Sequence, residues 1–288
     1  MKRIVNIFIL AILVFCLTGC LKRDTMEDIT IYTTNYPTEY ITRRLYGDYS
    51  TINSIYPDGV NINNYKLTEK QTQDYSSADL FIFNGLSNEK DYVEPMRKIN
   101  KDLKIIDTTL YMEYNNSVEE LWLDPSNFLM MAQNIKTGFN EYIDSYYLNN
   151  QIEENYEELK IEASNLDAKI KEIISNGNST TIIASSNLFK YLEKYGVTVY
   201  SLDESNSDVN AIYNQAVNMI NNGEIKYIFT IANEDSNSTV KKLISNTGVE
   251  TQEWNTISNL TETQRTNNED YFTIMNSNLE LLKNELYK

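Results

Sequence analysis

Hydrophobic positions in the first part of the chain switch between two periods. Short runs rich in Ile, Tyr and Phe have the pattern of buried strands, and between them apolar residues recur at helical spacing. This pattern predicts strands at residues 29–33, 51–55, 79–85 and 104–107, and helices at residues 37–46, 68–76 and 88–99. Strands that alternate with helices at such spacing indicate a parallel sheet with crossover helices.

The same alternation returns after residue 176. It predicts strands at 181–185, 197–202, 227–232 and 249–254, and helices at 187–195, 208–221, 238–246 and 268–286. We therefore expect a second α/β unit with a parallel sheet of its own.

The middle of the chain reads differently. Asp124 and Pro125 form a helix start, with Asp124 as the N-cap and proline at the first helical position. The stretch from Ser126 to about Ile174 has no proline, and apolar residues in it recur every three or four positions, which predicts one long amphipathic helix: Ile152, Tyr156, Leu159, Ala163, Leu166, Ile170 and Ile173.

The predicted fold class is α/β, with two lobes of mainly parallel sheets flanked by helices. The N-terminal lobe covers residues 29–145, a linker helix covers 146–175, and the C-terminal lobe covers 176–288. In open α/β sheets ligands bind at the carboxyl ends of the strands, so two facing lobes predict a cleft between them.

The first residues carry a targeting signal. Lys2 and Arg3 precede an apolar run over residues 4–15, which is short for a membrane span, and Leu17 to Cys20 reads L-T-G-C. This order resembles a bacterial lipobox. The resemblance implies a signal peptide at residues 1–19, a lipid on Cys20, a tether at residues 20–28 and attachment to the outer face of the cell membrane. The alternative is an ordinary signal peptide or anchor with a chance cysteine.

Composition narrows the functional class. The formal net charge is −16, so no basic surface for nucleic acid is evident. The chain has no histidine, and its only cysteines are Cys16 and Cys20. The common Ser/His and Cys/His catalytic pairs are therefore impossible in the mature protein, and we expect a protein that is not an enzyme.

One loop has the features of a ligand contact. Residues 57–67, PDGVNINNYKL, follow a predicted strand, and Gly59 permits a backbone angle that other residues avoid. The next helix starts at Thr68, where T-E-K-Q fits a capping box. A loop between a strand and a helix N-terminus often contacts a ligand.

Several segments together carry a family resemblance. W-L-D-P at residues 122–125 and the Y-P…Y-G-D stretch at 36–48 are the most specific, and the remaining matching segments lie at 57–68, 77–89, 186–197, 225–249 and 270–282. In this order and spacing the chain resembles the metal-binding lipoproteins of zinc and manganese ABC transporters. The resemblance implies two α/β lobes joined by one long helix, an ABC permease as partner, and zinc or manganese as the bound metal. No cofactor is certain.

The resemblance also marks four ligand positions. At the places where the family has histidine, histidine, histidine or glutamate, and an acidic residue, this chain has Asn63, Glu120, Ser186 and Asn255. Zinc favours imidazole, thiolate and carboxylate, so an oxygen-only set with one formal charge predicts a weak site. Glu113 and Glu119 lie near enough in sequence to contribute, whereas Asp124 is expected to cap its helix.

Two functional classes follow. The first is a lipid-anchored solute-binding protein of a metal ABC transporter with a divergent, weak metal site. The second is a degenerate lipoprotein that uses the same fold as an adhesin or interaction module. A neighbouring permease gene favours the first, and metal analysis of protein purified without chelator distinguishes them directly.

Overall fold

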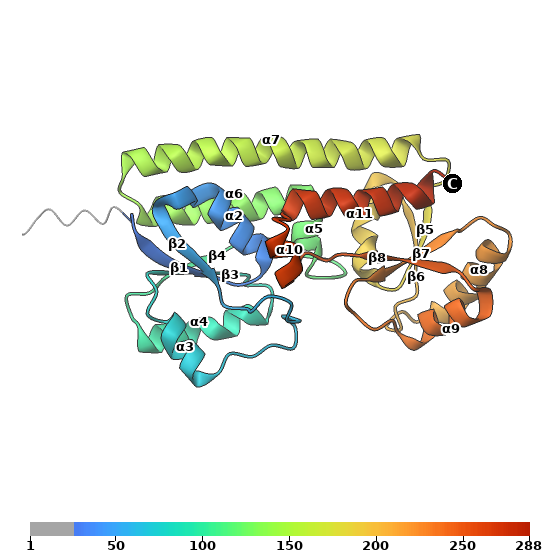
Figure 1. The fold of residues 1–288 in the computed structure, drawn as a ribbon, viewed down its shortest axis with the longest axis horizontal. Helices are drawn as coiled ribbons and strands as arrows, with labels where there is room; N and C mark the ends of the chain where they lie inside the picture. The colour runs from blue at the N-terminus through green and yellow to red at the C-terminus, as the bar shows by residue number, and fades with distance from the viewer. Residues whose placement is uncertain (1–25) are drawn as a thin grey trace, which may run out of the picture.

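The computed structural model describes residues 26–288, so the predicted signal peptide and Cys20 lie outside the described residues. Two four-stranded sheets stand side by side, and a long helix runs over both (Figure 1). All described strand pairs are parallel, and the strand orders are β2-β1-β3-β4 and β6-β5-β7-β8. The predicted fold of two parallel α/β lobes is confirmed. In this part of the chain, no helix is both long and apolar enough to cross a membrane.

The N-terminal lobe places its sheet between two groups of helices. Its strands are β1 (Ile29–Thr33), β2 (Ser50–Ser54), β3 (Leu80–Phe83) and β4 (Lys104–Asp107). Its helices are α2 (Tyr36–Tyr46), α3 (Glu69–Tyr75) and α4 (Val93–Ile99), with short 3₁₀ turns η1 (Gly47–Tyr49) and η2 (Asn88–Tyr92). Helices α3 and α4 lie below the sheet in Figure 1, and α2 lies above it.

The C-terminal lobe repeats this plan. Its strands are β5 (Thr181–Ala184), β6 (Thr198–Ser201), β7 (Tyr227–Ile231) and β8 (Glu250–Trp254). Its own helices are η3 (Asn187–Tyr195), α8 (Val209–Asn221) and α9 (Ser238–Thr247). Segment 187–195 is helical as predicted, but as a 3₁₀-helix.

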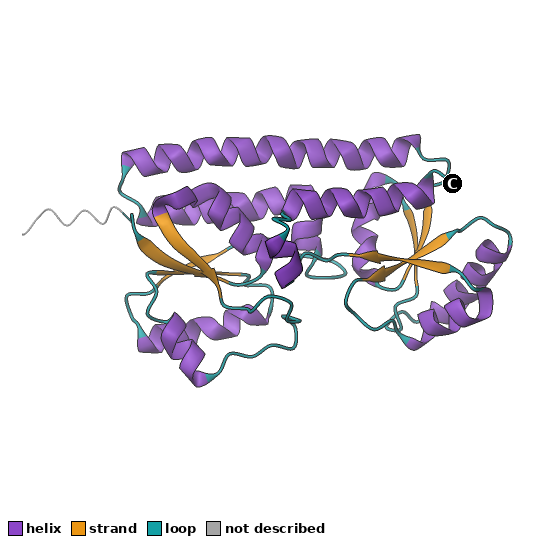
Figure 2. Ribbon diagram, in the orientation of Figure 1, coloured by secondary structure: helices purple, strands orange, loops and turns teal. Residues whose placement is uncertain are grey.

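A layer of helices joins the lobes (Figure 2). It contains α5 (Glu120–Leu123), α6 (Pro125–Tyr142), α7 (Tyr146–Asn176) and α11 (Tyr271–Leu286), and α7 packs against α2, α6 and α11. Helix α7 has 31 residues, which at about 1.5 Å per residue makes it about 46 Å long. Residues 143–145 separate α6 from α7, so the proline-free stretch contains two helices, and the second of them matches the linker helix predicted at residues 146–175.

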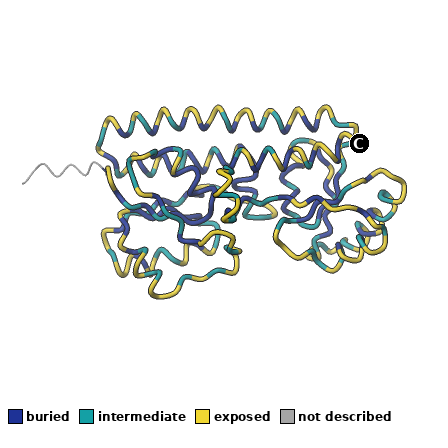
Figure 3. Tube along the Cα trace, viewed as in Figure 1, coloured by how far each residue is buried: buried dark blue, intermediate teal, exposed yellow. Residues whose placement is uncertain are grey.

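In each sheet, successive strand side chains point alternately into a core on one face and a core on the other, as expected for sheets buried on both faces. Ile82 of β3 and Phe229 of β7 point into one continuous core that the helical layer shares with both sheets. Phe81 faces a second core under α4, and Ile183 faces a third under α8 and α9. Figure 3 shows buried positions recurring along the helices of this layer and in both sheets. The lobes therefore share a hydrophobic core.

The helix ends in the structure can be compared one by one with the predicted ones. Asp124 accepts a hydrogen bond from the Ser126 amide (2.9 Å), and Thr68 forms the predicted capping box with Gln71. The last helix starts at Tyr271 rather than at residue 268, because Asn268 has φ of +54° and cannot continue a right-handed helix. Helix α10 (Glu262–Thr266) was not predicted, although its T-E-T-Q start is a second capping box.

Candidate functional site

A small polar cavity lies between the lobes, at the carboxyl ends of their strands. It has a volume of ≈ 100 Å³ and is bordered by four segments: the loop after β2, the turn before α5, the loop after β7 and the segment after β8. Its lining includes Asn61, Asn63, Asn233, Asn255, Asn259, Glu119 and Glu234. The position is the one that α/β lobes commonly use for ligands.

Asn63 and Asn255 are the two predicted ligand positions that the structure brings together. Both line the cavity, one from each lobe. Asn63 is exposed, and its amide donates to Asn61 Oδ1 (2.9 Å), which shapes the loop tip. Asn255 Oδ1 accepts the Ile257 amide (2.7 Å), so this oxygen already has a backbone partner.

Glu120 does not line the cavity. It is only 5% exposed, and its carboxylate accepts the amides of Asn115 and Asn116 (3.1 Å each) and Asn116 Nδ2 (2.8 Å). Three donors from one loop satisfy this charge, which is how a buried carboxylate is normally held. In this structure Glu120 therefore fixes the loop before α5.

Ser186 lies in a neighbouring cavity of ≈ 280 Å³ within the C-terminal lobe. Its hydroxyl accepts the Leu188 amide (3.2 Å) and so caps η3. Asp203, Glu204 and Asp235 line the same cavity, and Glu234 borders both cavities. Of the four predicted positions, two thus share the inter-lobe cavity, one borders its neighbour and one is buried beside it.

The two carboxylates that do line the inter-lobe cavity are Glu119 and Glu234. Glu119 comes from the N-terminal lobe and accepts a hydrogen bond from the Ser117 hydroxyl. Glu234 comes from the loop after β7, where burial and then the negative charge of Glu119 raise its pKa. Sequence reasoning did not single out Glu234, although it lies in the matching segment 225–249, because only folding brings it to the same cavity as Glu119.

The side chains that line this cavity can offer a metal ion only oxygen atoms as ligands. Amide and carboxylate oxygens suit hard cations such as Ca²⁺ and Mn²⁺ better than zinc. Among residues 26–288 no group of three or more His, Cys, Asp and Glu side chains is placed to hold a metal ion. Two carboxylates with several amides can offer a cation a polar setting, but with fewer charges than a strong calcium site uses.

The fold defines a class. Two parallel α/β lobes, a shared helical layer with one long helix, and a polar cavity at the strand ends describe a helix-linked solute-binding protein. The chain matches the family model described as "Zinc-uptake complex component A periplasmic" over residues 31–285. It belongs to this family of substrate-binding proteins of metal ABC transporters, which are transport proteins and not enzymes.

The chain is also similar in sequence to proteins that are named as substrate-binding lipoproteins of metal ABC transporters. The chain is 26% identical over 233 residues to the manganese ABC transporter substrate-binding lipoprotein PsaA of Streptococcus pneumoniae, covering 73% of this chain and 74% of that protein. It is also 26% identical over 315 residues to a metal ABC transporter substrate-binding lipoprotein of Lactococcus lactis, covering 100% and 98%.

Solved structures share the fold. The Zn(II)-bound ZnuA-like domain of Streptococcus pneumoniae AdcA has a TM-score of 0.73 at 22% identity, covering 91% of this chain and 100% of that one. The laminin-binding protein Lbp of Streptococcus pyogenes has a TM-score of 0.71 at 16% identity, covering 90% and 99%. At such identities the likeness concerns the fold alone.

Proposed function

We propose that this protein is the lipid-anchored, extracytoplasmic solute-binding component of a metal ABC transporter, with a divergent site that holds a hard divalent cation and holds zinc poorly. The observation that carries the proposal is the inter-lobe cavity, which a chain without histidine lines with asparagine side chains and two glutamates. Family membership supplies the transporter class.

The cation would lie between Glu119 and Glu234. These like charges face a common cavity, and the charge of Glu119 contributes to the raised pKa of Glu234. A divalent cation would replace this repulsion with attraction to both carboxylates. Asn63 and Asn255 lie in the same lining and would add neutral oxygens at most.

Zinc would gain less from this site than from the usual one. Its preferred donors include imidazole and thiolate, and the mature chain holds no histidine and, after processing before Cys20, only a lipidated cysteine. Glu120 and Ser186 already accept hydrogen bonds from backbone amides, so their use as ligands would break those contacts. We therefore expect zinc to bind here much less tightly than it binds to a site built from imidazoles.

Calorimetric titration of the mature protein with Mn²⁺ and Zn²⁺ tests the site. Glu119→Gln and Glu234→Gln should each weaken Mn²⁺ binding by about tenfold, the size of one lost charge-assisted contact of about 1.4 kcal/mol. Glu113→Gln is the matched control, because Glu113 is exposed outside the cavity lining. Tight zinc binding by the unmodified protein would contradict the proposal, and a protein that binds no metal would support the interaction module instead.

Anchoring rests on the sequence alone, because Cys20 lies outside the described residues. The curated relatives named as lipoproteins support it. Cys20→Ser should yield protein that is released into the medium or stays unprocessed, measured by fractionation and mass spectrometry of the N-terminus. A processed Cys20→Ser protein that remains fully membrane-bound would contradict lipid anchoring.

A further inference from the structure

The segment after β8 does not stay in its own lobe. Residues 255–261, here called the strap, cross to the N-terminal lobe and bond to residues 57–64, here called the cleft loop. The Gly59 amide donates to Leu260 O (2.8 Å), and Asn259 Nδ2 donates to Pro57 O (2.8 Å) and Val60 O (3.1 Å). The Asn259 carboxamide therefore holds both ends of the turn that carries Gly59.

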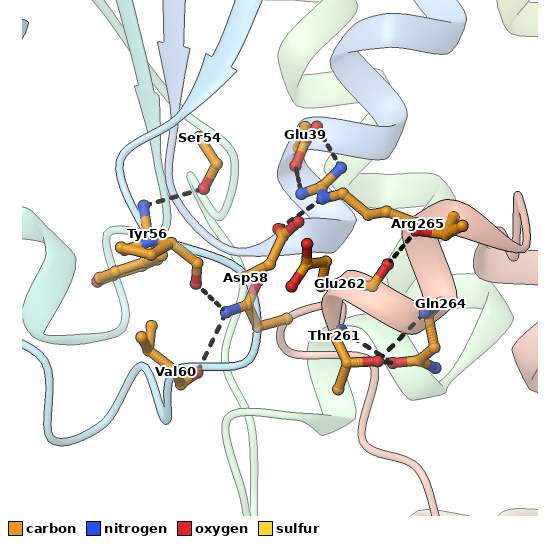
Figure 4. A network of polar contacts seen from close by, with 12 residues as sticks. Glu39, Ser54, Tyr56, Asp58, Val60, Thr261, Glu262, Gln264 and Arg265 are labelled. Atoms are coloured by element: carbon orange, nitrogen blue, oxygen red, sulfur yellow. Dashed lines mark hydrogen bonds and ion pairs between the residues drawn. The ribbon is translucent and has the colours of Figure 1, made fainter.

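An arginine strengthens this connection immediately after the strap. Arg265 of α10 donates through Nη1 and Nη2 to the two carboxylate oxygens of Glu39 (3.1 and 2.8 Å), and through Nε to Asp58 Oδ1 (2.5 Å). Figure 4 shows Arg265 between Glu39 of α2 and Asp58 of the cleft loop. The Glu39 side chain is only 2% exposed, so this two-pronged ion pair is largely removed from water.

Helix α10 is itself held in place. The Thr261 hydroxyl accepts the Gln264 amide (3.2 Å), and Gln264 Oε1 accepts the Thr261 amide (3.0 Å), which closes a capping box. The strap also bonds to α2, where the Tyr36 amide donates to Ser258 O (3.0 Å). Two of the four segments that border the cavity, the cleft loop and the strap, thus form one connected wall.

The opposite wall is built differently. It consists of Glu119 and the loop at residues 232–234. Glu119 accepts a hydrogen bond from Ser117 of its own turn, and the amide of Glu234 donates to Ile231 O (3.4 Å) of its own loop. Both carboxylates line this part of the cavity. Repulsion favours separation of these two segments when no cation lies between them.

We propose that Asn259 and Arg265 latch the cleft loop to the strap, and that solute enters and leaves through the opposite wall, between Glu119 and residues 232–234. The latch makes Asn259 and Arg265 positioning residues for Asn61 and Asn63, which follow the latched turn in the cleft loop. A cation that bridges Glu119 and Glu234 closes the wall through which it entered. The entry route and the cation that closes it rest on the proposed function; the latch does not.

Hydrogen exchange of the metal-free mature protein tests the latch. Arg265→Met should speed exchange in residues 57–64 by about tenfold or more, since bonds to charged groups contribute about 1.5–3 kcal/mol. Arg44→Met is the matched control, because Arg44 also makes a two-pronged pair, with Glu162 (2.8 and 2.9 Å), but on the α2–α7 contact away from the cavity.

A second variant keeps the test decisive if Arg265→Met fails to fold. Asn259→Ala removes only the two bonds to Pro57 and Val60, and should also speed exchange in the cleft loop. Exchange in residues 57–64 that matches the wild type in a folded Arg265→Met or Asn259→Ala protein overturns the proposal.

Distances between spin labels test the entry wall. Asn64→Cys with Glu262→Cys spans the latched wall, and Asn115→Cys with Asp235→Cys spans the opposite wall; all four residues are exposed. With Ca²⁺ as a diamagnetic probe, the first distance should stay unchanged and the second should shorten and narrow. A change confined to the first pair overturns the entry route. If Ca²⁺ changes neither distance, the proposed entry route is overturned, while hydrogen exchange still decides the latch.

Discussion

The two lobes have the same strand order, but they differ in how far the carboxylates at their strand ends are buried and paired. In the N-terminal lobe Glu39, Glu89 and Glu120 are buried, and each accepts hydrogen bonds from donors around it. In the C-terminal lobe the acidic residues at the same edge, Asp203, Glu204, Glu234 and Asp235, are half-buried or exposed. The difference follows from what covers each edge.

The N-terminal edge is covered by chain that arrives from elsewhere. The strap and α10 come from the end of the sequence, and the Trp122 indole also donates to Thr256 O (2.7 Å) of the strap. Covered carboxylates need partners, and here they find arginine and backbone amides. This comparison suggests a preorganised strand-end edge in the N-terminal lobe and a more adaptable strand-end edge in the C-terminal lobe.

The largest effect should come from removing Glu39. Glu39→Ala leaves Arg265 without its buried partner and also releases Arg43, whose Nε donates to Glu39 (2.8 Å). Breaking a buried pair costs about 3–5 kcal/mol, and we expect the lower end because Arg265 is 31% exposed. Urea unfolding measures the loss. Glu162→Ala, which breaks the half-exposed pair with Arg44, should cost less than about 1 kcal/mol. Equal losses would remove the distinction between the pairs.

Glu89 should make stability depend on pH. It is 3% exposed, and burial raises its pKa to about 7 against the partial compensation of hydrogen bonds from Asn84 and Asn35. The folded state therefore keeps the proton that the unfolded state loses near pH 4.5, so this group's contribution is full below about pH 4.5 and is lost as pH rises to about 7.

Glu89→Gln, which imitates the protonated carboxyl, should flatten this part of the profile. Unfolding free energies measured between pH 5 and about pH 8 for both proteins check it. A wild-type slope that persists unchanged in the Glu89→Gln protein would assign the pH dependence to another group.

Asp203 should act with the opposite sign in the C-terminal lobe. Partial burial acts to raise its pKa, but hydrogen bonds from Ser205 and from the Asn187 amide outweigh it, and the pKa is lowered. Its contribution is present above its unfolded pKa and is lost as pH falls through the folded value. Asp203→Asn should cost about 1 kcal/mol at neutral pH and less in acid, measured by thermal unfolding. A constant cost across that range would argue against ionisation.

The smallest expected effect concerns the angle between the lobes. The shared core and the helices α6, α7 and α11 tie the sheets together, so a solute should change their relative orientation only slightly. Solution scattering of the mature protein with and without Mn²⁺ measures this. A closure as large as that of flexible-hinge binding proteins would show that the helical layer bends more easily than its packing suggests.

Most of the fold could be predicted from local patterns in the sequence. The strand runs, the helix start at Asp124 and the capping box at Thr68 depend on neighbours within a few residues, and each is confirmed in the structure. The linker helix predicted at residues 146–175 matches α7, although the apolar pattern does not mark the break before it, because Ile143 is buried while its backbone turns extended. Helix α10 was missed because its few residues leave no apolar period to detect.

The site depended on contacts between distant residues. The absence of histidine, the restriction to oxygen donors and the loops at the strand ends could be predicted from the sequence alone, since they follow from composition and local periodicity. Only the tertiary structure directed Glu120 into its own loop, set Glu234 opposite Glu119 and brought Arg265 to Glu39, 226 residues away in sequence. The physical reason is that a buried charge must find its partner wherever the folded chain supplies one, and no local pattern records that partner.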